Sequence, residues 1–475
     1  MLMLFFAVTS FAQVTSSSIN GTIIDENKQG IFGAVVFVKH VPSGTNYGST
    51  TNDKGFYVVN NVAAGGPYSI KISYIGYADT TISDVYLSLG EDYKLNMSLQ
   101  LKGVTMKEVS ITAKGTKKDG QVSKEQIQTL PTLSRNISDF TKLTPQSSNN
   151  SFNGTNFRYN NVTLDGSINN DAIGFSPSLG GQSGTSNMPG SSTRTSPISL
   201  DAIQTMQVAI APYDVKYGNF TGGSINAVTR SGTNKVEGSV YSYGRNGMVT
   251  GPDNVGDRSA MPSGYYDYQT GFRIGMPLKK DKLFVFLNAE TTNRNEPLFY
   301  GAGQSGSFMT TAIAKQITDS LQSKTFSPNG TYNPGAYENY SIFAKSNKIF
   351  TRFDWNINEK NKLSLRTNFI KSSASNLERS TNEFQFGNYD FIQNNLNSST
   401  VAELKTKIGT KLNNSAIVGF LSSQMMGSTN FLLKPVFKLW DRTFHDGNVQ
   451  WYATDKTHIK KLFLELETLA GELVV

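Results

Sequence analysis

Apolar and polar residues alternate over much of this chain, with the period of two that is typical of half-buried β-strands. The clearest examples are residues 349–357 and 362–369, which the polar stretch Asn-Glu-Lys-Asn separates. In the first stretch, Phe353, Trp355 and Ile357 alternate with charged or amide residues. We predict an antiparallel hairpin with one apolar and one polar face. Outer-membrane barrels have such hairpins, and so do soluble sandwiches with one solvated face.

Further hairpins of this kind are predicted between residues 235 and 427. Strand-like stretches occupy residues 235–244, 271–277 and 283–290, and a polar turn separates the last two. Residues 291–347 are expected to form long loops. Because a membrane-crossing strand needs only about ten alternating residues, this region fits the first part of a transmembrane antiparallel β-barrel, and a soluble β-sandwich with one solvated face satisfies the same alternation.

Residues 17–101 predict a small β-sandwich of about seven strands. Turn-forming segments such as Asn52-Asp53-Lys54-Gly55 separate short strand-like stretches. The expected strands are residues 19–24, 34–39, 55–60, 68–74 and 95–101. Before this domain, residues 1–12 (MLMLFFAVTSFA) are apolar and end in small residues suited to cleavage before Gln13, which predicts a signal peptide and export.

Residues 107–231 predict a domain that mixes helices and strands. Ser123-Lys124-Glu125-Gln126 predicts a capping box at the start of a helix. Ile137, Phe140 and Leu143 recur with helical spacing, which predicts a second short helix packed on a core.

The second half of this domain is predicted to consist of strands joined by glycine-rich turns. Asp165-Gly166 predicts a tight turn, and Gly222-Gly223 predicts a close backbone approach or a positive φ. Asp201 precedes an amphipathic turn and then a strand. Residues 174–192 are rich in Gly, Ser and Pro and too polar for a core, so we expect either a ligand-contacting loop or a disordered spacer.

Two segments resemble a known family when they are taken in order. Residues 201–208 (DAIQTMQV) and 211–232 (APYDVKYGNFTGGSINAVTRSG) resemble the end of the plug domain in TonB-dependent outer-membrane receptors. The strings GTIIDE, GAVVFV and SYIGY in residues 17–101 resemble the carboxypeptidase regulatory-like domain that precedes receptors of the Bacteroidetes type. The resemblance implies a plug at residues 107–231, whose motif consists of Asp165, Gly166, Tyr217, Gly218, Gly222 and Gly223.

A six-residue segment before the plug resembles the energy-coupling box of this family. It consists of Glu108, Val109, Ser110, Ile111, Thr112 and Ala113. Such a short extended segment can add as a strand to the sheet edge of a partner, although an ordinary linker strand has the same pattern. The resemblance implies energy-coupled uptake of an unidentified ligand. The implied partners are a periplasmic TonB-type protein and outer-membrane lipid. A cell-surface binding or adhesive protein without transport is the alternative.

Composition and residue spacing argue against nucleic-acid binding and against catalysis. The net charge is +8, but the cations are scattered over turns and strand ends, as at Lys279, Lys280 and Lys282, so we expect no nucleic-acid partner. The chain contains no cysteine, which excludes disulfides and thiol catalysis. The three histidines have no glutamate at the spacing of a zinc peptidase. We therefore expect no enzyme, no catalytic or metal site and no cofactor.

The last residues depart from the alternating pattern. Residues 428–475 contain two of the three histidines and two of the three tryptophans of the chain. A barrel that encloses a plug has about 22 strands, and residues 236–475 supply about half of that length. We expect a truncated or frame-shifted receptor, with a helical partner-binding tail as the alternative for this segment.

Overall fold

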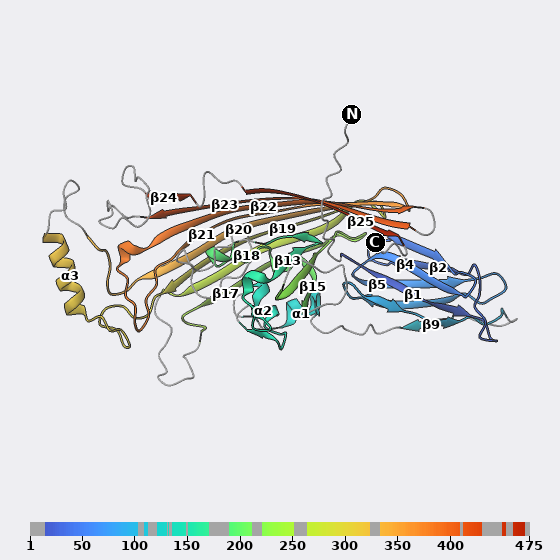
Figure 1. Cartoon of the computed structure of the whole chain (residues 1–475), viewed down its shortest axis with the longest axis horizontal. Coiled ribbons are helices and arrows are strands. Elements are labelled where there is room, and N and C mark those ends of the chain that lie inside the picture. Colours follow the sequence, from blue (N-terminus) through green and yellow to red (C-terminus); the bar gives the residue numbers. More distant parts are fainter. Residues whose placement is uncertain are drawn as a thin grey trace, which may run out of the picture.

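The computed structural model describes residues 15–102, 109–112, 121–130, 132, 135–148, 151–170, 190–210, 221–250, 264–323, 333–408, 412–429, 449–452 and 459–470. These residues form three units: an N-terminal domain, a central domain and a large antiparallel sheet (Figure 1). The predicted signal peptide lies outside the described residues, and so do Tyr217 and Gly218 of the predicted motif. Among the described residues, no helix has the length and apolar character needed to cross a bilayer.

The N-terminal domain is a β-sandwich. One sheet has the order β4-β1-β7, with β8 also on β1, and the other has the order β3-β2-β5-β6-β9. The inward side chains of both sheets form one apolar core that includes Ile19, Val36 and Tyr68. The strands are β1 (Ser16–Ile24), β2 (Val35–His40), β3 (Asn46–Thr50), β4 (Phe56–Ala63), β5 (Gly65–Ser73), β6 (Thr80–Leu87), β7 (Asp92–Lys94), β8 (Met97–Ser98) and β9 (Val109–Thr112).

The sandwich predicted from the sequence is confirmed, but three of its strands, β3, β6 and β7, were missed. β3 is a polar edge strand, and β6 contains Asp84 at a φ of 59°, which interrupts its alternation. The single strand predicted for residues 95–101 is wrong, since only Met97–Ser98 (β8) forms a strand there.

The central domain packs two short helices against a five-stranded sheet of order β10-β15-β16-β13-β14. Its first elements are β10 (Gln121–Ser123), α1 (Lys124–Thr129), α2 (Ile137–Thr141), β11 (Ser147–Ser148), β12 (Ser151–Phe152) and η1 (Phe157–Tyr159). The remaining elements are β13 (Asn161–Leu164), β14 (Ser167–Ile168), η2 (Ser191–Thr193), η3 (Leu200–Ala202), β15 (Ile203–Ile210) and β16 (Gly223–Thr229).

Both predicted helices are present in the central domain. The capping box is confirmed: the Ser123 hydroxyl accepts from the Gln126 N–H, and the Gln126 side chain accepts from the Ser123 N–H at 3.0 Å. Ile137 and Phe140 are buried as expected. Leu143 is 54% exposed, contrary to the prediction, because α2 ends at Thr141 and its apolar face is too short to include this residue.

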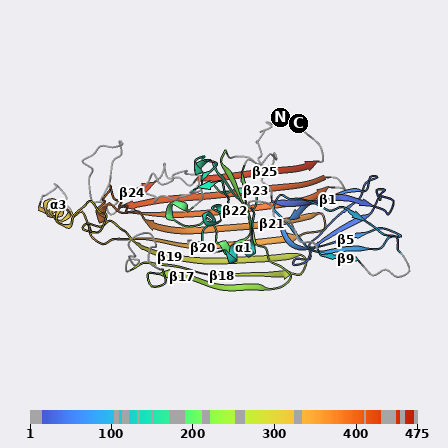
Figure 2. The ribbon, with the colours of Figure 1, turned by 90° about the horizontal axis from the view of Figure 1, so that it is seen from below.

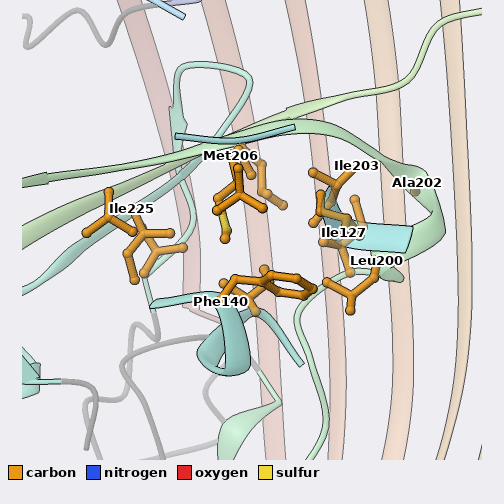
Figure 3. Packing of buried hydrophobic residues seen from close by; sticks show 14 of the residues in the cluster. Ile127, Phe140, Leu200, Ala202, Ile203, Met206 and Ile225 are labelled. Atoms are coloured by element: carbon orange, nitrogen blue, oxygen red, sulfur yellow. The ribbon is translucent and has the colours of Figure 1, made fainter. Parts of the chain in front are cut away.

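One apolar cluster holds the helices of the central domain on its sheet. Phe140 of α2 and Ile127 of α1 meet Met206 of β15 and Ile225 of β16, with Leu200 beside them (Figure 3). The same cluster extends to aromatic rings of the large sheet, so the central domain has no separate core on that side. This continuity fixes the central domain to the inner face of the sheet.

The large sheet is an antiparallel meander from β17 to β23, and both β24 and β25 pair with β23. Within the described residues it is not closed, because β17 and the last strands do not pair with each other. Its elements are β17 (Glu237–Asn246), β18 (Tyr266–Lys279), β19 (Leu283–Pro297), α3 (Thr311–Ser323), β20 (Ser341–Asn356), β21 (Asn361–Ser375), η4 (Gly387–Tyr389), β22 (Phe391–Ile408), β23 (Leu412–Thr429), β24 (Val449–Tyr452) and β25 (Ile459–Ala470).

The two faces of this sheet differ in polarity, as predicted. Apolar side chains such as Trp355 and Leu365 face outward and are 46% and 41% exposed. Polar side chains such as Lys348, Arg366 and Asn368 face inward and are buried. The central domain covers this inner face, and the N-terminal domain lies at the end of the sheet that carries the short turns (Figures 1 and 2).

Two expectations for this region are wrong. Residues 291–347 are not all loop: β19 continues to Pro297, β20 begins at Ser341, and α3 lies between them. The helical alternative for the tail also fails for Ile459–Ala470, which forms β25. Leucines recur there at every second position from 462 to 466, a period that suits a strand.

Candidate functional site at the inner face of the sheet

The turn between β13 and β14 directs a carboxylate toward the large sheet. Asp165 and Gly166 occupy this two-residue turn with φ angles of 47° and 79°, as Asp-Gly turns of this type require. The Asp165 carboxylate is 4% exposed. It accepts from the Thr229 N–H at 2.7 Å and from the Thr229 hydroxyl at 2.6 Å. The turn is thereby fixed to the end of β16.

Two arginines from the large sheet meet this carboxylate. Arg366 of β21 pairs with Asp165 (Nε–Oδ2, 3.0 Å) and donates to the Leu164 and Asp165 carbonyls. Arg352 of β20 pairs with Asp165 (Nη1–Oδ1, 3.4 Å) and makes two shorter contacts of 2.8 Å with Asp354. Removing one partner of such a buried group costs about 3–5 kcal/mol, because the remaining charge is left uncompensated.

A second ion cluster surrounds Asp201 of η3. Its carboxylate is 2.9 Å from Arg135 and 3.6 Å from Arg273 of β18. The Arg135 guanidinium also lies 3.6 Å above the ring of Tyr243 in β17. Burial raises the pKa of Asp201, and the two guanidinium groups oppose that shift. The cluster joins the central domain to two strands of the sheet.

A third polar cluster is centred on Glu290 of β19. Lys348 of β20 pairs with it at 2.9 Å, and both side chains are 4% exposed. Ser199, just before η3, donates to Glu290 at 2.6 Å, and Tyr241 donates at 3.1 Å. Three acidic groups therefore connect the central domain to strands β17 to β21.

The C-terminal end of the Gly/Ser/Pro-rich segment at residues 174–192 is buried. Residues 171–189 lie outside the described residues, but Ser192 and Thr193 are only 4% and 0% exposed. Asn395 donates to the Ser192 hydroxyl at 2.8 Å, and the Thr193 and Ser372 hydroxyls are 2.7 Å apart. The expectation that this segment is too polar for a core is wrong at Ser192, because the polar inner face of the sheet provides a hydrogen-bond partner for its hydroxyl group.

The paired glycines permit a close approach inside the central domain. A Cβ atom at Gly223 would lie 2.5 Å from the ring of Phe152, and one at Gly222 would lie 2.5 Å from the Asn160 amide oxygen. Neither glycine is among those with positive φ. Of the two readings made from the sequence, close approach is therefore the one that the structure supports.

The β2–β3 loop of the N-terminal domain and the first residues of β3 contact the turn end of the large sheet. We call residues 42–48 the docking loop. The ammonium of Lys362 lies 3.3 Å above the Tyr47 ring. The hydrogen bonds run from Asn234 N to Pro42 O (2.8 Å), from Asn356 Nδ2 to Thr45 Oγ1 (3.1 Å), from Lys362 Nζ to Asn46 O (3.2 Å) and from Lys407 Nζ to Gly48 O (2.8 Å). These contacts are polar, so the docking loop can separate without exposing a large apolar surface.

A cavity of about 1310 Å³ lies next to the docking loop, between the three units. Its walls include Tyr47, Thr229, Arg352 and Lys362. His40 also lines it, with Nδ1 2.7 Å from the Ser43 hydroxyl. Burial, together with the positive charge of Lys362, lowers the pKa of His40 to about 4. The imidazole is therefore neutral at physiological pH.

The predicted coupling segment is described only in part. Glu108 and Ala113 lie outside the described residues, whereas Val109–Thr112 forms β9. β9 pairs in parallel with β6 of the N-terminal domain, so the segment extends that domain's own sheet. Sequence reasoning missed Arg352, Arg366 and Lys348, although each is an isolated cation on an alternating strand and pairs with a buried carboxylate.

Known proteins match separate parts of the chain. Residues 18–100 match the carboxypeptidase regulatory-like domain, and residues 228–302 match an outer membrane beta barrel domain. The TonB-dependent transporter Oar of Myxococcus xanthus is 25% identical over 307 residues, which cover 60% of this chain and 27% of that protein. The chain thus spans about a quarter of the length of this curated relative.

Two solved structures of outer-membrane proteins resemble the chain at low sequence identity. The siderophore receptor PirA from Acinetobacter baumannii is 15% identical with a TM-score of 0.42, and the match covers 70% of this chain and 43% of PirA. The outer membrane transporter YddB from Escherichia coli is 14% identical with a TM-score of 0.45, and the match covers 70% of this chain and 42% of YddB.

The curated relative is a transporter. The outer membrane beta barrel match and the curated transporter indicate the outer membrane as the location of the chain. Together with the carboxypeptidase regulatory-like domain at residues 18–100, these findings show that the chain is similar to part of a TonB-dependent transporter of the outer membrane.

Proposed function

We propose that this chain takes part in energy-coupled uptake of a ligand through the outer membrane, with the central domain as the plug. The observation that carries the proposal is the Asp165 cluster, in which two arginines of the sheet hold a turn of the central domain. Charged contacts of this kind resist spontaneous movement, because breaking one leaves a buried charge unpaired. Movement of the central domain would therefore cost free energy, which an energy-coupling partner would supply.

The polar character of the inner face supports a movable plug. Carboxylate, guanidinium and hydroxyl groups on both sides can be hydrated once they separate, whereas a wholly apolar interface would expose a large surface to water. The cavity beside the docking loop lies at the turn end of the sheet, where a ligand that passes the central domain would leave. The identity of that ligand does not follow from these features.

The coupling role is proposed for residues 108–113. A periplasmic TonB-type protein would bind this segment by strand addition, which uses backbone N–H and C=O groups and tolerates many side chains. Tension on the segment would reach the central domain through the chain that follows it. A surface-binding protein without transport needs no such partner, so binding of the coupling protein separates the two functions.

The test compares two double variants of the full chain. Val109→Pro with Ile111→Pro removes two backbone donors, and Ser110→Ala with Thr112→Ala is the control that keeps the backbone intact. Binding to the purified periplasmic domain of the host's TonB-type protein is measured by interferometry. We expect the proline variant to lose binding at least tenfold and the alanine variant to bind as the unmodified chain does. Equal binding by all three chains, or by none, would refute the coupling role.

A further inference from the structure

The coupling segment forms the edge strand of a folded domain. β9 lies at one end of the sheet β3-β2-β5-β6-β9, and its four residues pair in register with residues 80–83 of β6. We infer that the N-terminal domain presents this segment as a preformed edge strand, and that a partner adds its own strand to the open edge of β9. The inference rests on the coupling role proposed above and states how the partner would reach the segment.

The backbone of β9 has one side available for a partner. In a parallel ladder, successive N–H and C=O groups point alternately to the two sides of a strand, so pairing with β6 uses only one side. In the part of the chain that the structure describes, no strand pairs with the other side of β9. An edge strand with unpaired backbone groups is a template for strand addition by a second protein.

Displacement of β9 from β6 by a free partner is disfavoured by the connection between them. Only residues 103–108 join Lys102 of the N-terminal domain to β9. A short tether gives an effective concentration on the order of millimolar, far above that of a dilute protein in the periplasm. The partner therefore gains more by adding to the open edge than by competing for the edge that β6 already occupies.

Pairing with β6 also prepares the segment for binding. A disordered segment loses conformational freedom when a partner orders it, and this loss weakens binding. Residues 109–112 already have an extended backbone on β6, so much of that ordering precedes the encounter. The docking loop lies in the same domain and contacts the turn end of the sheet, which also fixes where the open edge is presented.

A disulfide can test whether β9 stays on β6 during binding. The chain has no cysteine, so introduced thiols have no competitors. Thr81 and Ser110 are register partners, and we propose Thr81→Cys with Ser110→Cys in the full chain. Ser49→Cys with Ser110→Cys is the matched control, because Ser49 lies in β3 at the opposite edge of the sheet. Ser83→Cys with Thr112→Cys provides an independent second pair.

Binding to the purified periplasmic domain of the host's TonB-type protein is measured for the oxidised and the reduced forms. We expect the disulfide to form in both register pairs but not in the control, and the oxidised chain to bind within twofold of the reduced chain or more tightly. Failure of both register pairs to cross-link would overturn the inference. So would a tenfold loss of binding on oxidation, since the segment would then have to leave β6. If the disulfide forms but neither form binds, the coupling role itself fails.

Discussion

Replacing Asp165 by Asn provides the sharpest test of how the central domain is held. Asn keeps the size of the side chain and tolerates the positive φ of this turn, so the turn itself is retained. The substitution removes the charge that faces Arg366 and Arg352. Its effect therefore reports on the ion pairs rather than on the backbone.

The structure indicates which of the two arginines loses more of its contacts in this variant. Arg352 keeps its two contacts with Asp354. Arg366 keeps two carbonyl acceptors, but its Nε, now 3.0 Å from an Asp165 oxygen, would lose its carboxylate. The Asn oxygen can still accept from the Thr229 N–H, so we expect the lower end of the range for a broken buried pair, about 3 kcal/mol.

Hydrogen–deuterium exchange measures this loss locally. A decrease of about 3 kcal/mol in the local free energy of unfolding corresponds to roughly hundredfold faster exchange, and we expect it in peptides from β13 to β16. Asp84→Asn is the matched control, because Asp84 also has a positive φ but is exposed in the N-terminal domain. Adding Arg366→Met to the Asp165→Asn variant should recover at least 1 kcal/mol by removing the unpaired charge. A change of less than threefold in the single variant would refute this account of the interface.

Three further predictions concern packing, pH and a second ion pair. Gly223→Ala should destabilise the central domain by about 1–3 kcal/mol, because the new methyl group would overlap the Phe152 ring; urea unfolding that leaves the midpoint unchanged would contradict it. The folded-state pKa of His40 is lowered from 6.5 to about 4, so unfolded chains take up the proton first. The contribution of neutral His40 to the free energy of unfolding is complete above pH 6.5 and is lost as the pH falls toward 4, a decrease of up to about 3 kcal/mol. Thermal unfolding measures this decrease, and His40→Gln should remove it. Lys348→Met leaves the Glu290 carboxylate buried without its cation and should cost about 3–5 kcal/mol, whereas adding Glu290→Leu should restore part of the loss in the same assay.

Local chemistry explains which features could be predicted from the sequence. The Asp165-Gly166 turn and the Ser123 capping box depend on residues within four positions of one another, so their residue types alone predict them. The alternating strands of the large sheet were predictable for the same reason. Successive side chains of a strand point to opposite faces, so the alternation of apolar and polar residues distinguishes the outward from the inward face. Strand ends were less predictable, as β19 and β20 show by continuing past the stretch of clear alternation.

The ion clusters could not be predicted, because they depend on contacts between distant parts of the chain. Asp165 and Arg366 are 201 residues apart, and their pairing requires both the sheet register and the position of the central domain. The polar segment at Ser192 and Thr193 shows the same limit, since its burial depends on amide and hydroxyl groups of β21 and β22. A buried polar residue is recognised only when its partner is known.

The coupling segment shows why a strand can be predicted while its partner cannot. The residues of β9 favour an extended backbone, but the ladder with β6 is made by N–H and C=O groups that every non-proline residue carries. A ladder of four residues depends little on the types of their side chains, because backbone groups make it. The distance along the chain therefore decides which sheet edge the segment joins. The nearest available edge belongs to the domain that precedes it in the chain. Under the proposed coupling role, a partner that also recognises the backbone would meet a strand with one side already occupied, and it would add to the open side of β9.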